Sequence, residues 1–213
     1  MNVKYDTIIF DLDGTLLDTS RGIFNSVRYA ERMLNLPPVE DETLRRFVGP
    51  PPKSMYMEIY GLDEKTAETA TLYHRQYGKE RGFCEAELYP DVKTVLRVLK
   101  DKGYHLTVAT LKAQNVTDKV LSYFSIDQFF DKIIGMNPQE NLTKQDTIEL
   151  SIAGITSFER ALMVGDSLYD MLGAKDSGVD FLAALYGFGF NDLVNDTCCI
   201  GNVYRFSDVL LYI

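Results

Sequence analysis

Residues 8–19 read Ile-Ile-Phe-Asp-Leu-Asp-Gly-Thr-Leu-Leu-Asp-Thr, and this stretch decides the fold. Its apolar start predicts a buried strand, which ends at two carboxylates, Asp11 and Asp13, followed by Gly14. Because alternate strand residues share a face, we expect both carboxylates on one side of the strand end. A strand followed by a simple turn is the ordinary explanation for Asp-x-Asp-Gly alone. Two carboxylates held close in a dry pocket, however, need a cation, a shared proton or a catalytic role.

The composition indicates a globular protein with an excess of acidic residues. Its 213 residues fit one large domain or two modest ones, and 46% of them are hydrophobic. The formal net charge of -9 argues against nucleic acid as a partner, because neutralising a phosphate backbone needs a basic surface. A small phosphorylated substrate stays compatible with this charge, since a bound metal can override the global field locally.

The cysteines and the apolar segments indicate the cellular localisation of the protein. Cys84, Cys198 and Cys199 show no zinc-ligand spacing, which predicts reduced thiols in a cytoplasmic protein. Acidic residues interrupt the first positions, so we expect no signal peptide. The longest largely apolar segment, residues 181–190, is too short to span a bilayer. We therefore expect no membrane association.

The pattern along the chain predicts two domains. Helical periodicity, without a convincing strand, covers residues 19–82. From residue 91 onward, strands alternate with helices, which is typical of a parallel sheet with helices on both faces. The expected fold is a Rossmann-like three-layer α/β core, residues 1–17 and 85–213, with an inserted helical cap, residues 18–84. The strands are predicted at 5–10, 104–109, 132–136, 161–164 and 179–185, and the last residues, 207–213, as a short helix.

Polar side chains stand at the predicted strand ends. In such sheets ligands bind beyond the carboxyl ends of the strands, so these residues are expected on one rim. Each has an ordinary explanation: Thr110 and Asp166 as helix caps, and Lys144 as a solvated lysine. Their joint position at successive strand ends favours a functional site. The candidate set is Asp11, Asp13, Thr110, Lys144, Asp166 and Asp170.

These residues, in this order, resemble the motifs of the haloacid dehalogenase-like hydrolase superfamily. The resemblance implies that Asp11 is a nucleophile that takes up a phosphoryl group. It implies that Asp13 is the general acid and base for the leaving group and then for water. Thr110 and Lys144 match the hydroxyl and the ammonium that bind the phosphoryl oxygens in that family.

The fourth motif matches Gly165-Asp166-Ser167-Leu168-Tyr169-Asp170, whose acidic residues hold Mg²⁺ in the family. The expected metal residues are Asp11, Asp13 through its backbone carbonyl, Asp166 and Asp170, with Asp170 orienting the others. Residues 48–51 and 185–189 resemble loops of the phosphoglycolate phosphatase-like branch, which carries a small helical cap. Residues 110–113 depart from that branch: they read Thr-Leu-Lys-Ala where relatives often read Thr-Ser-Lys-Pro.

The resemblance implies a magnesium-dependent phosphatase that hydrolyses a small phosphate monoester through an aspartyl-phosphate. Phosphoglycolate-like, nucleotide and sugar phosphates all fit. Asp13 favours a phosphate ester over a haloacid, because a leaving alkoxide needs a proton and a halide does not. The alternatives are a phosphomutase, a phosphonate hydrolase with Lys53 as a formal imine-forming lysine, and an idle binding or regulatory module. The sequence does not decide whether Arg45, Arg46 or Lys112 contacts substrate, or whether the protein is a monomer or a homodimer. The expected partner is a small phosphorylated metabolite.

Overall fold

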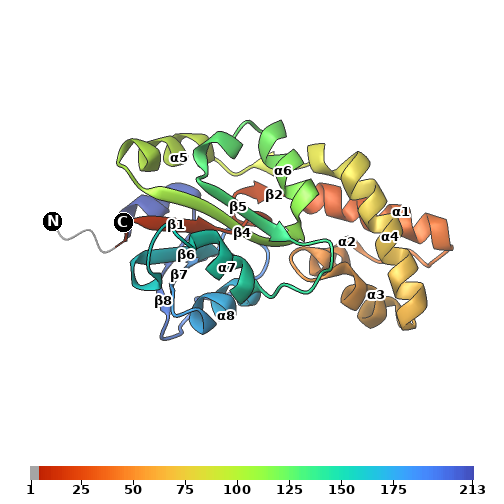
Figure 1. Ribbon diagram of the computed structural model, residues 1–213. Helices are drawn as coiled ribbons and strands as arrows, with labels where there is room; N and C mark the ends of the chain where they lie inside the picture. Colours follow the sequence, from red (N-terminus) through yellow and green to blue (C-terminus); the bar gives the residue numbers. More distant parts are fainter. Residues whose placement is uncertain (1–4) are drawn as a thin grey trace. The chain divides into compact units, whose positions relative to one another are not determined.

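The computed structural model describes residues 5–213, and within them the chain forms two compact units (Figure 1). The first unit comprises the chain up to Leu17 together with Leu88–Ile213, and the second comprises Asp18–Glu87. The chain crosses between the units twice. At these crossings two short strands, β2 (Leu17–Asp18) and β3 (Glu87–Leu88), pair with each other.

A six-stranded sheet with the order β5-β4-β1-β6-β7-β8 forms the centre of the first unit. Every pair of neighbouring strands in it is parallel. In the central strand β1, Phe10 lies opposite Val108 of β4 and Val164 of β6. The predicted parallel sheet is therefore confirmed. Its strands are β1 (Thr7–Phe10), β4 (His105–Ala113), β5 (Lys132–Met136), β6 (Ala161–Gly165), β7 (Asp180–Ala184) and β8 (Cys199–Val203).

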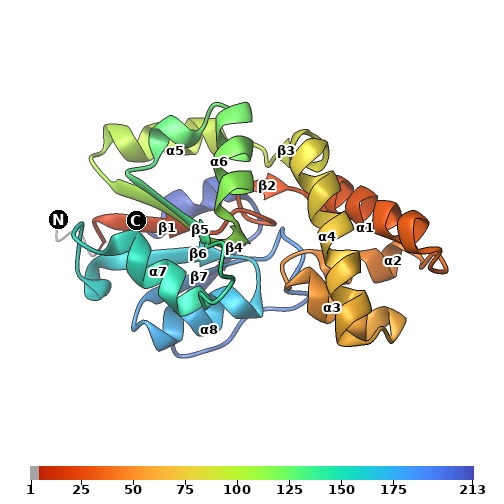
Figure 2. The ribbon, with the colours of Figure 1, turned by 45° about the vertical axis from the view of Figure 1, so that its right-hand side comes forward.

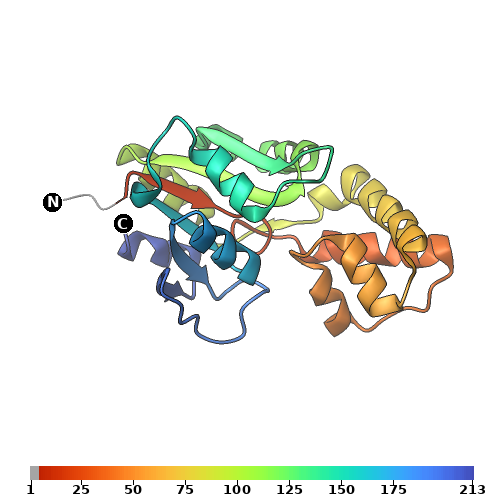
Figure 3. The ribbon, with the colours of Figure 1, turned by 60° about the horizontal axis from the view of Figure 1, so that its bottom comes forward.

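Helices cover both faces of this sheet, as the three-layer prediction requires. Helices α5 (Val92–Asp101) and α6 (Gln114–Tyr123) lie on one face (Figures 1 and 2). Helices α7 (Lys144–Ile152) and α8 (Leu168–Asp176) lie on the other, which comes forward in Figure 3. Covered on both sides, β1 and β6 are fully buried, which is why their sequences are continuous apolar runs. The short 3₁₀ helices η3 (Asp127–Phe129), η4 (Phe158–Arg160) and η5 (Phe206–Leu211) complete the unit.

Several elements differ from the sequence prediction. Strand β4 continues to Ala113, past the predicted end at residue 109. Strand β8 was not predicted, because Cys-Ile-Gly-Asn-Val mixes polar and apolar residues and most of this edge strand is only half-buried. The predicted terminal helix is a 3₁₀ segment, η5. The two-residue strand β3 is not among the strands that the sequence predicts.

The second unit is helical and has its own apolar core. Helices α1 and α4 pack side by side, and α3 packs against α4 (Figure 2). The core side chains are Val27, Ala30, Leu44, Phe47, Tyr56, Ala67 and Ala70. The helices are α1 (Ser20–Leu34), α2 (Asp41–Leu44), η1 (Arg45–Phe47), α3 (Pro52–Tyr60), α4 (Glu64–Glu80) and η2 (Gly82–Cys84). In residues 5–213, no helix has the length and apolar character needed to cross a membrane.

Candidate active site

The sheet topology brings the predicted site residues to one edge. The chain runs from β1 to β4 and β5 on one side, then returns to β6 on the other side of β1. Such a reversal of strand order is the place where open α/β sheets bind ligands, beyond the carboxyl ends of the strands. Asp11 stands at this reversal, and its backbone N–H donates to the carbonyl oxygen of Val164 at 3.0 Å. Asp166 directly follows β6, so the two carboxylates leave adjacent strands together.

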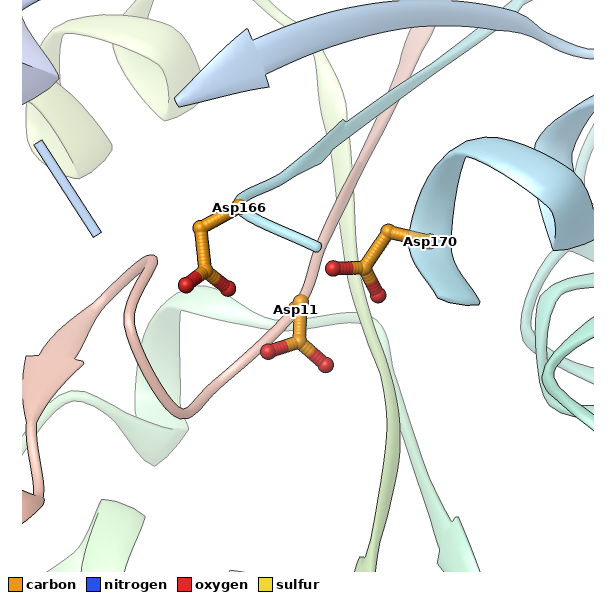
Figure 4. A group of neighbouring side chains, drawn as sticks. All are labelled: Asp11, Asp166 and Asp170. Carbon is orange, nitrogen blue, oxygen red and sulfur yellow. The ribbon is translucent and has the colours of Figure 1, made fainter. Parts of the chain in front are cut away.

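Three carboxylates converge at this edge. The carboxylate groups of Asp11, Asp166 and Asp170 lie close together, at the ends of β1 and β6 and in the first turn of α8 (Figure 4). One oxygen from each lies within 4.8 Å of the others, and all three residues are buried. The fold thus brings together three acidic residues that are far apart in the sequence: Asp11 and Asp170 are separated by 159 positions. Three ionised carboxylates this close repel one another and require compensating positive charge.

Lys144 supplies part of that compensation from the start of α7. Its Nζ donates to Oδ1 of Asp11 at 2.5 Å and pairs with Oδ1 of Asp170 at 2.6 Å. The carbonyl oxygen of Ala109 accepts a third bond at 2.7 Å. Burial alone would lower the pKa of Lys144, but the two carboxylates outweigh it and raise the pKa, so the ammonium stays charged. One ammonium between three carboxylates leaves negative charge uncompensated.

Backbone amides that the sequence analysis did not identify hold Asp166. Its Oδ2 accepts from the N–H groups of Phe188 at 2.7 Å and Gly189 at 3.3 Å. The loop can approach this closely because Gly187 has no side chain: a Cβ there would lie 2.3 Å from Cβ of Asp166. Burial raises the pKa of Asp166 well above its usual range, with a further contribution from the charge of Asp170. The sequence marks this loop by its pair of glycines and by the resemblance of residues 185–189 to a loop of the phosphoglycolate phosphatase-like branch, but neither signal identifies the amides as partners of Asp166.

Asp170 belongs to a helix cap as well as to the site. Ser167 is the N-cap of α8, and Oδ2 of Asp170 accepts from its backbone N–H at 2.9 Å and its hydroxyl at 2.7 Å. The Ser167 hydroxyl in turn accepts from the N–H of Asp170, which completes a capping box. This cap fixes the carboxylate while Oδ1 faces Lys144.

Asp13 does not join the three converging carboxylates. Its two carboxylate oxygens accept from Nζ of Lys112 at 2.9 and 3.0 Å. Gly14, which follows, has a φ of +84°, a conformation that glycine adopts readily and that turns the chain sharply after Asp13. Thr110 is buried in β4, and its hydroxyl oxygen accepts from the backbone N–H of Lys112 at 3.3 Å.

Burial also perturbs the ionisation of the Asp11 carboxyl group. Burial raises its pKa from 3.8 to about 7, and the negative charge of Asp170 adds to the increase. Lys144 opposes the rise through its charge and its hydrogen bond. A cation bound beside Asp11 would favour its ionised form in the same way.

The donor set suits a hard divalent cation. All three converging side chains offer carboxylate oxygens, the ligands that Mg²⁺ prefers. Among the described residues, no donor reaches Oδ2 of Asp11 or Oδ1 of Asp166. These two oxygens and the uncompensated charge fit a metal site, with Asp11 and Asp166 as the residues that would hold the ion.

Other cationic candidates from the sequence lie in the helical unit, where each pairs with a carboxylate. Arg45 contacts Glu42 at 3.4 Å, and Arg46 pairs with Glu58. Lys53 donates to Glu64 at 2.9 Å. The sequence leaves undecided whether Arg45 and Arg46 contact substrate and indicates Lys53 only as a formal imine-forming lysine, and nothing in these contacts tests either role.

The chain belongs to the haloacid dehalogenase-like hydrolases. Residues 8–184 match the model of that family, and they include the strand-end motifs described above. The resemblance drawn from the sequence, with its phosphoglycolate phosphatase-like branch, is therefore confirmed, and so is the prediction of a hydrolase of this family.

Individual relatives carry different names. A 5'-nucleotidase from Pseudomonas aeruginosa is 34% identical over 193 residues, which are 89% of this chain and 87% of that protein. The tyrosine-protein kinase PtkA of Mycobacterium tuberculosis is 33% identical over 192 residues, 89% of this chain but only 65% of that protein. The crystal structure of a predicted phosphatase from Clostridium acetobutylicum aligns with a TM-score of 0.90 at 34% identity, and covers 98% of this chain and 99% of that one.

Proposed function

We propose that this protein is a magnesium-dependent phosphatase that hydrolyses small phosphate monoesters through an aspartyl-phosphate on Asp11. The observation that carries the proposal is the buried convergence of Asp11, Asp166 and Lys144 at the carboxyl ends of β1 and β6. The nucleotidase and the phosphatase among the relatives support the same chemistry.

Asp11 acts as the nucleophile. A carboxylate oxygen of Asp11 attacks phosphorus, and the bond between phosphorus and the leaving oxygen breaks as the new bond forms. Lys144 holds Oδ1 of Asp11 and favours its ionised, nucleophilic form through the 2.5 Å hydrogen bond. Bound Mg²⁺ would supply further positive charge for the transferring phosphoryl group.

Asp13 completes both half-reactions. It gives its proton to the leaving alkoxide, which would otherwise be a poor leaving group. It then takes a proton from the water that attacks phosphorus, so that the Asp11 carboxylate is released with inorganic phosphate. Thr110 and Lys144 bind the phosphoryl oxygens from β4 and α7.

Substrate choice is the role that we assign to the helical unit, residues 18–87, as a cap domain. The leaving group of the proposed monoester substrate is a small organic alcohol, and the relatives' names do not agree on one.

The test is phosphate release from phosphoglycolate, a nucleoside monophosphate and a sugar phosphate, with and without Mg²⁺. Wild type is compared with Asp11→Asn and with Asp196→Asn as a matched control, since Asp196 pairs with Lys175 on the surface. We expect turnover in wild type and control only, and a phosphoenzyme trapped by acid quenching that Asp11→Asn does not form. Magnesium-dependent turnover by Asp11→Asn would overturn the mechanism. Transfer of the phosphoryl group to a peptide tyrosine instead of to water would favour a kinase.

A further inference from the structure

We propose that Lys112 is a positioning residue: it aims the carboxyl group of Asp13 for proton transfer to the leaving group. The inference deepens the proposed function and rests on it. Lys112 thereby acquires a specific role, one that the sequence leaves open between a substrate contact and a solvated lysine.

The ion pair between Lys112 and Asp13 involves both carboxylate oxygens and is largely shielded from solvent. Nζ of Lys112 lies 2.9 Å from Oδ2 and 3.0 Å from Oδ1 of Asp13, although the residues are 99 positions apart. The side chains are 18% and 13% exposed, much less than most ion pairs of this chain. Within residues 5–213, no other hydrogen bond or ion pair reaches the Asp13 carboxylate. Lys112 is therefore what sets the orientation of this group in the described chain.

The backbone around Lys112 is held firmly. The register between β4 and β5 shifts between Ala109 and Ala113, so Lys112 sits in an irregular end of the strand. Its N–H donates to the Thr110 hydroxyl at 3.3 Å, and its carbonyl oxygen accepts from the Thr117 hydroxyl at 3.3 Å. The neighbouring strand comes so close that a Cβ on Gly135 would lie 2.7 Å from this carbonyl oxygen. An irregular strand end fixed from three directions is a suitable base for a lysine that must hold one position.

Orientation matters more for Asp13 than for the other acids. Asp11 and Asp170 are each fixed by Lys144, and Asp166 by the amides of its loop. Asp13 stands at the entrance of a glycine turn, without a backbone donor. A general acid contributes only when its proton lies within hydrogen-bond reach of the leaving oxygen. Loss of Lys112 should therefore lower the efficiency of proton transfer and spare phosphoryl binding and nucleophilic attack.

The experiment uses the leaving group as the readout. We compare kcat/KM for an alkyl phosphate, whose alkoxide must be protonated, with kcat/KM for p-nitrophenyl phosphate, whose phenolate leaves without a proton. Because kcat/KM covers steps only up to departure of the leaving group, later hydrolysis of the phosphoenzyme does not enter. The variants are Lys112→Met, Lys112→Arg, Asp13→Asn and Lys100→Met. Lys100 is the matched control, since it contacts both oxygens of Asp131 at 2.9 and 3.0 Å away from the site edge.

Positioning predicts a selective loss. In Lys112→Met, kcat/KM for the alkyl ester should fall about 10- to 100-fold and that for p-nitrophenyl phosphate less than about 3-fold. Asp13→Asn should show the same selectivity more strongly. Lys112→Arg should recover part of the alkyl activity, because a guanidinium can also bind both carboxylate oxygens. Lys100→Met should change neither value.

Two outcomes would overturn the inference. An equal fall on both esters in Lys112→Met would mean that the lysine binds the phosphoryl group or supports the fold. No change on either ester would make the contact a passive ion pair. Failure of the proposed function is distinguishable, because then wild type itself would show no magnesium-dependent turnover or Asp13→Asn would show no leaving-group selectivity.

Discussion

Raising the pH from 5 to 7 should destabilise the metal-free protein through the Asp11 carboxyl group. Asp11 is 6% exposed, and burial raises its pKa from 3.8 to about 7 in the folded state. Between these values the folded protein holds a proton that the unfolded chain has lost. The free energy of unfolding therefore falls as the pH rises. This contribution is fully present below pH 3.8 and is lost as the pH passes through about 7.

The size of the effect follows from the same two pKa values. One proton bound in the folded state alone gives a slope approaching about 1.4 kcal/mol per pH unit. Integrated from pH 5 to pH 7, where the folded-state group is itself titrating, the loss is about 2 kcal/mol. Asp166 acts in the same direction, because burial raises its pKa too. Mg²⁺ should remove the slope, since a cation beside Asp11 favours the ionised form and stabilises the folded state by mass action.

The assay is differential scanning calorimetry at pH 5, 6 and 7, in EDTA and in saturating Mg²⁺. A change of 1 kcal/mol moves the midpoint by about 3 °C for a chain of this size. Other groups also titrate in this range, so the informative quantity is the difference between wild type and Asp11→Asn. Asparagine keeps the shape and an oxygen for Lys144 but carries no charge. In EDTA at pH 7, Asp11→Asn should melt higher than wild type, and the gap should narrow toward pH 5.

The reasoning would be refuted if wild type and Asp11→Asn showed parallel pH profiles in EDTA. It would also fail if Mg²⁺ stabilised Asp11→Asn as much as wild type. Either result would mean that Asp11 is not the group whose protonation responds to burial and to the cation.

Two further predictions concern the packing around the site and the helical unit. Gly187→Ala places a Cβ 2.5 Å from Oδ2 of Asp166, so it should weaken Mg²⁺ binding about 10-fold by displacing this carboxylate. Isothermal titration calorimetry measures the affinity, and an unchanged value would show that the loop does not support the metal. Glu31→Ala removes a buried acceptor for the Tyr60 hydroxyl at 2.7 Å and the Val39 N–H at 3.0 Å, and should destabilise the helical unit by about 1–3 kcal/mol. Urea unfolding followed by circular dichroism checks this, and no change in midpoint would contradict it.

The sequence predicts the buried parts of the fold better than its edges. Runs such as 8–10 and 161–164 are apolar because helices cover both faces of the sheet there, and this burial leaves a direct trace in composition. Strand β8 is an edge strand that is mostly half-buried, so its sequence is not a continuous apolar run and does not predict a strand. Strand β4 ends later than predicted because it pairs irregularly with β5 beyond Ala109. That pairing depends on the neighbouring strand and not on local propensity.

The same distinction applies to the candidate site. Side chains that follow buried strands could be predicted to meet, since parallel strands end at one edge. The amides of Phe188 and Gly189 could not, because a backbone donor has no residue type that marks it. The sequence could not show whether Lys112 pairs with Asp13 or is exposed to solvent, because the pairing depends on how two distant strand ends come together.

The hydrogen bonds at the site also indicate different roles for its three converging carboxylates. Asp170 has one oxygen engaged by the helix cap and the other by Lys144, so both its oxygens are already satisfied by the protein. Asp11 and Asp166 each have one oxygen held and one that no described residue donates to. A cation that exchanges water for carboxylate oxygens gains most from the oxygens that lack donors, because no existing hydrogen bond is lost. We therefore propose that Asp11 and Asp166 bind the metal directly and that Asp170 fixes Lys144 against Asp11.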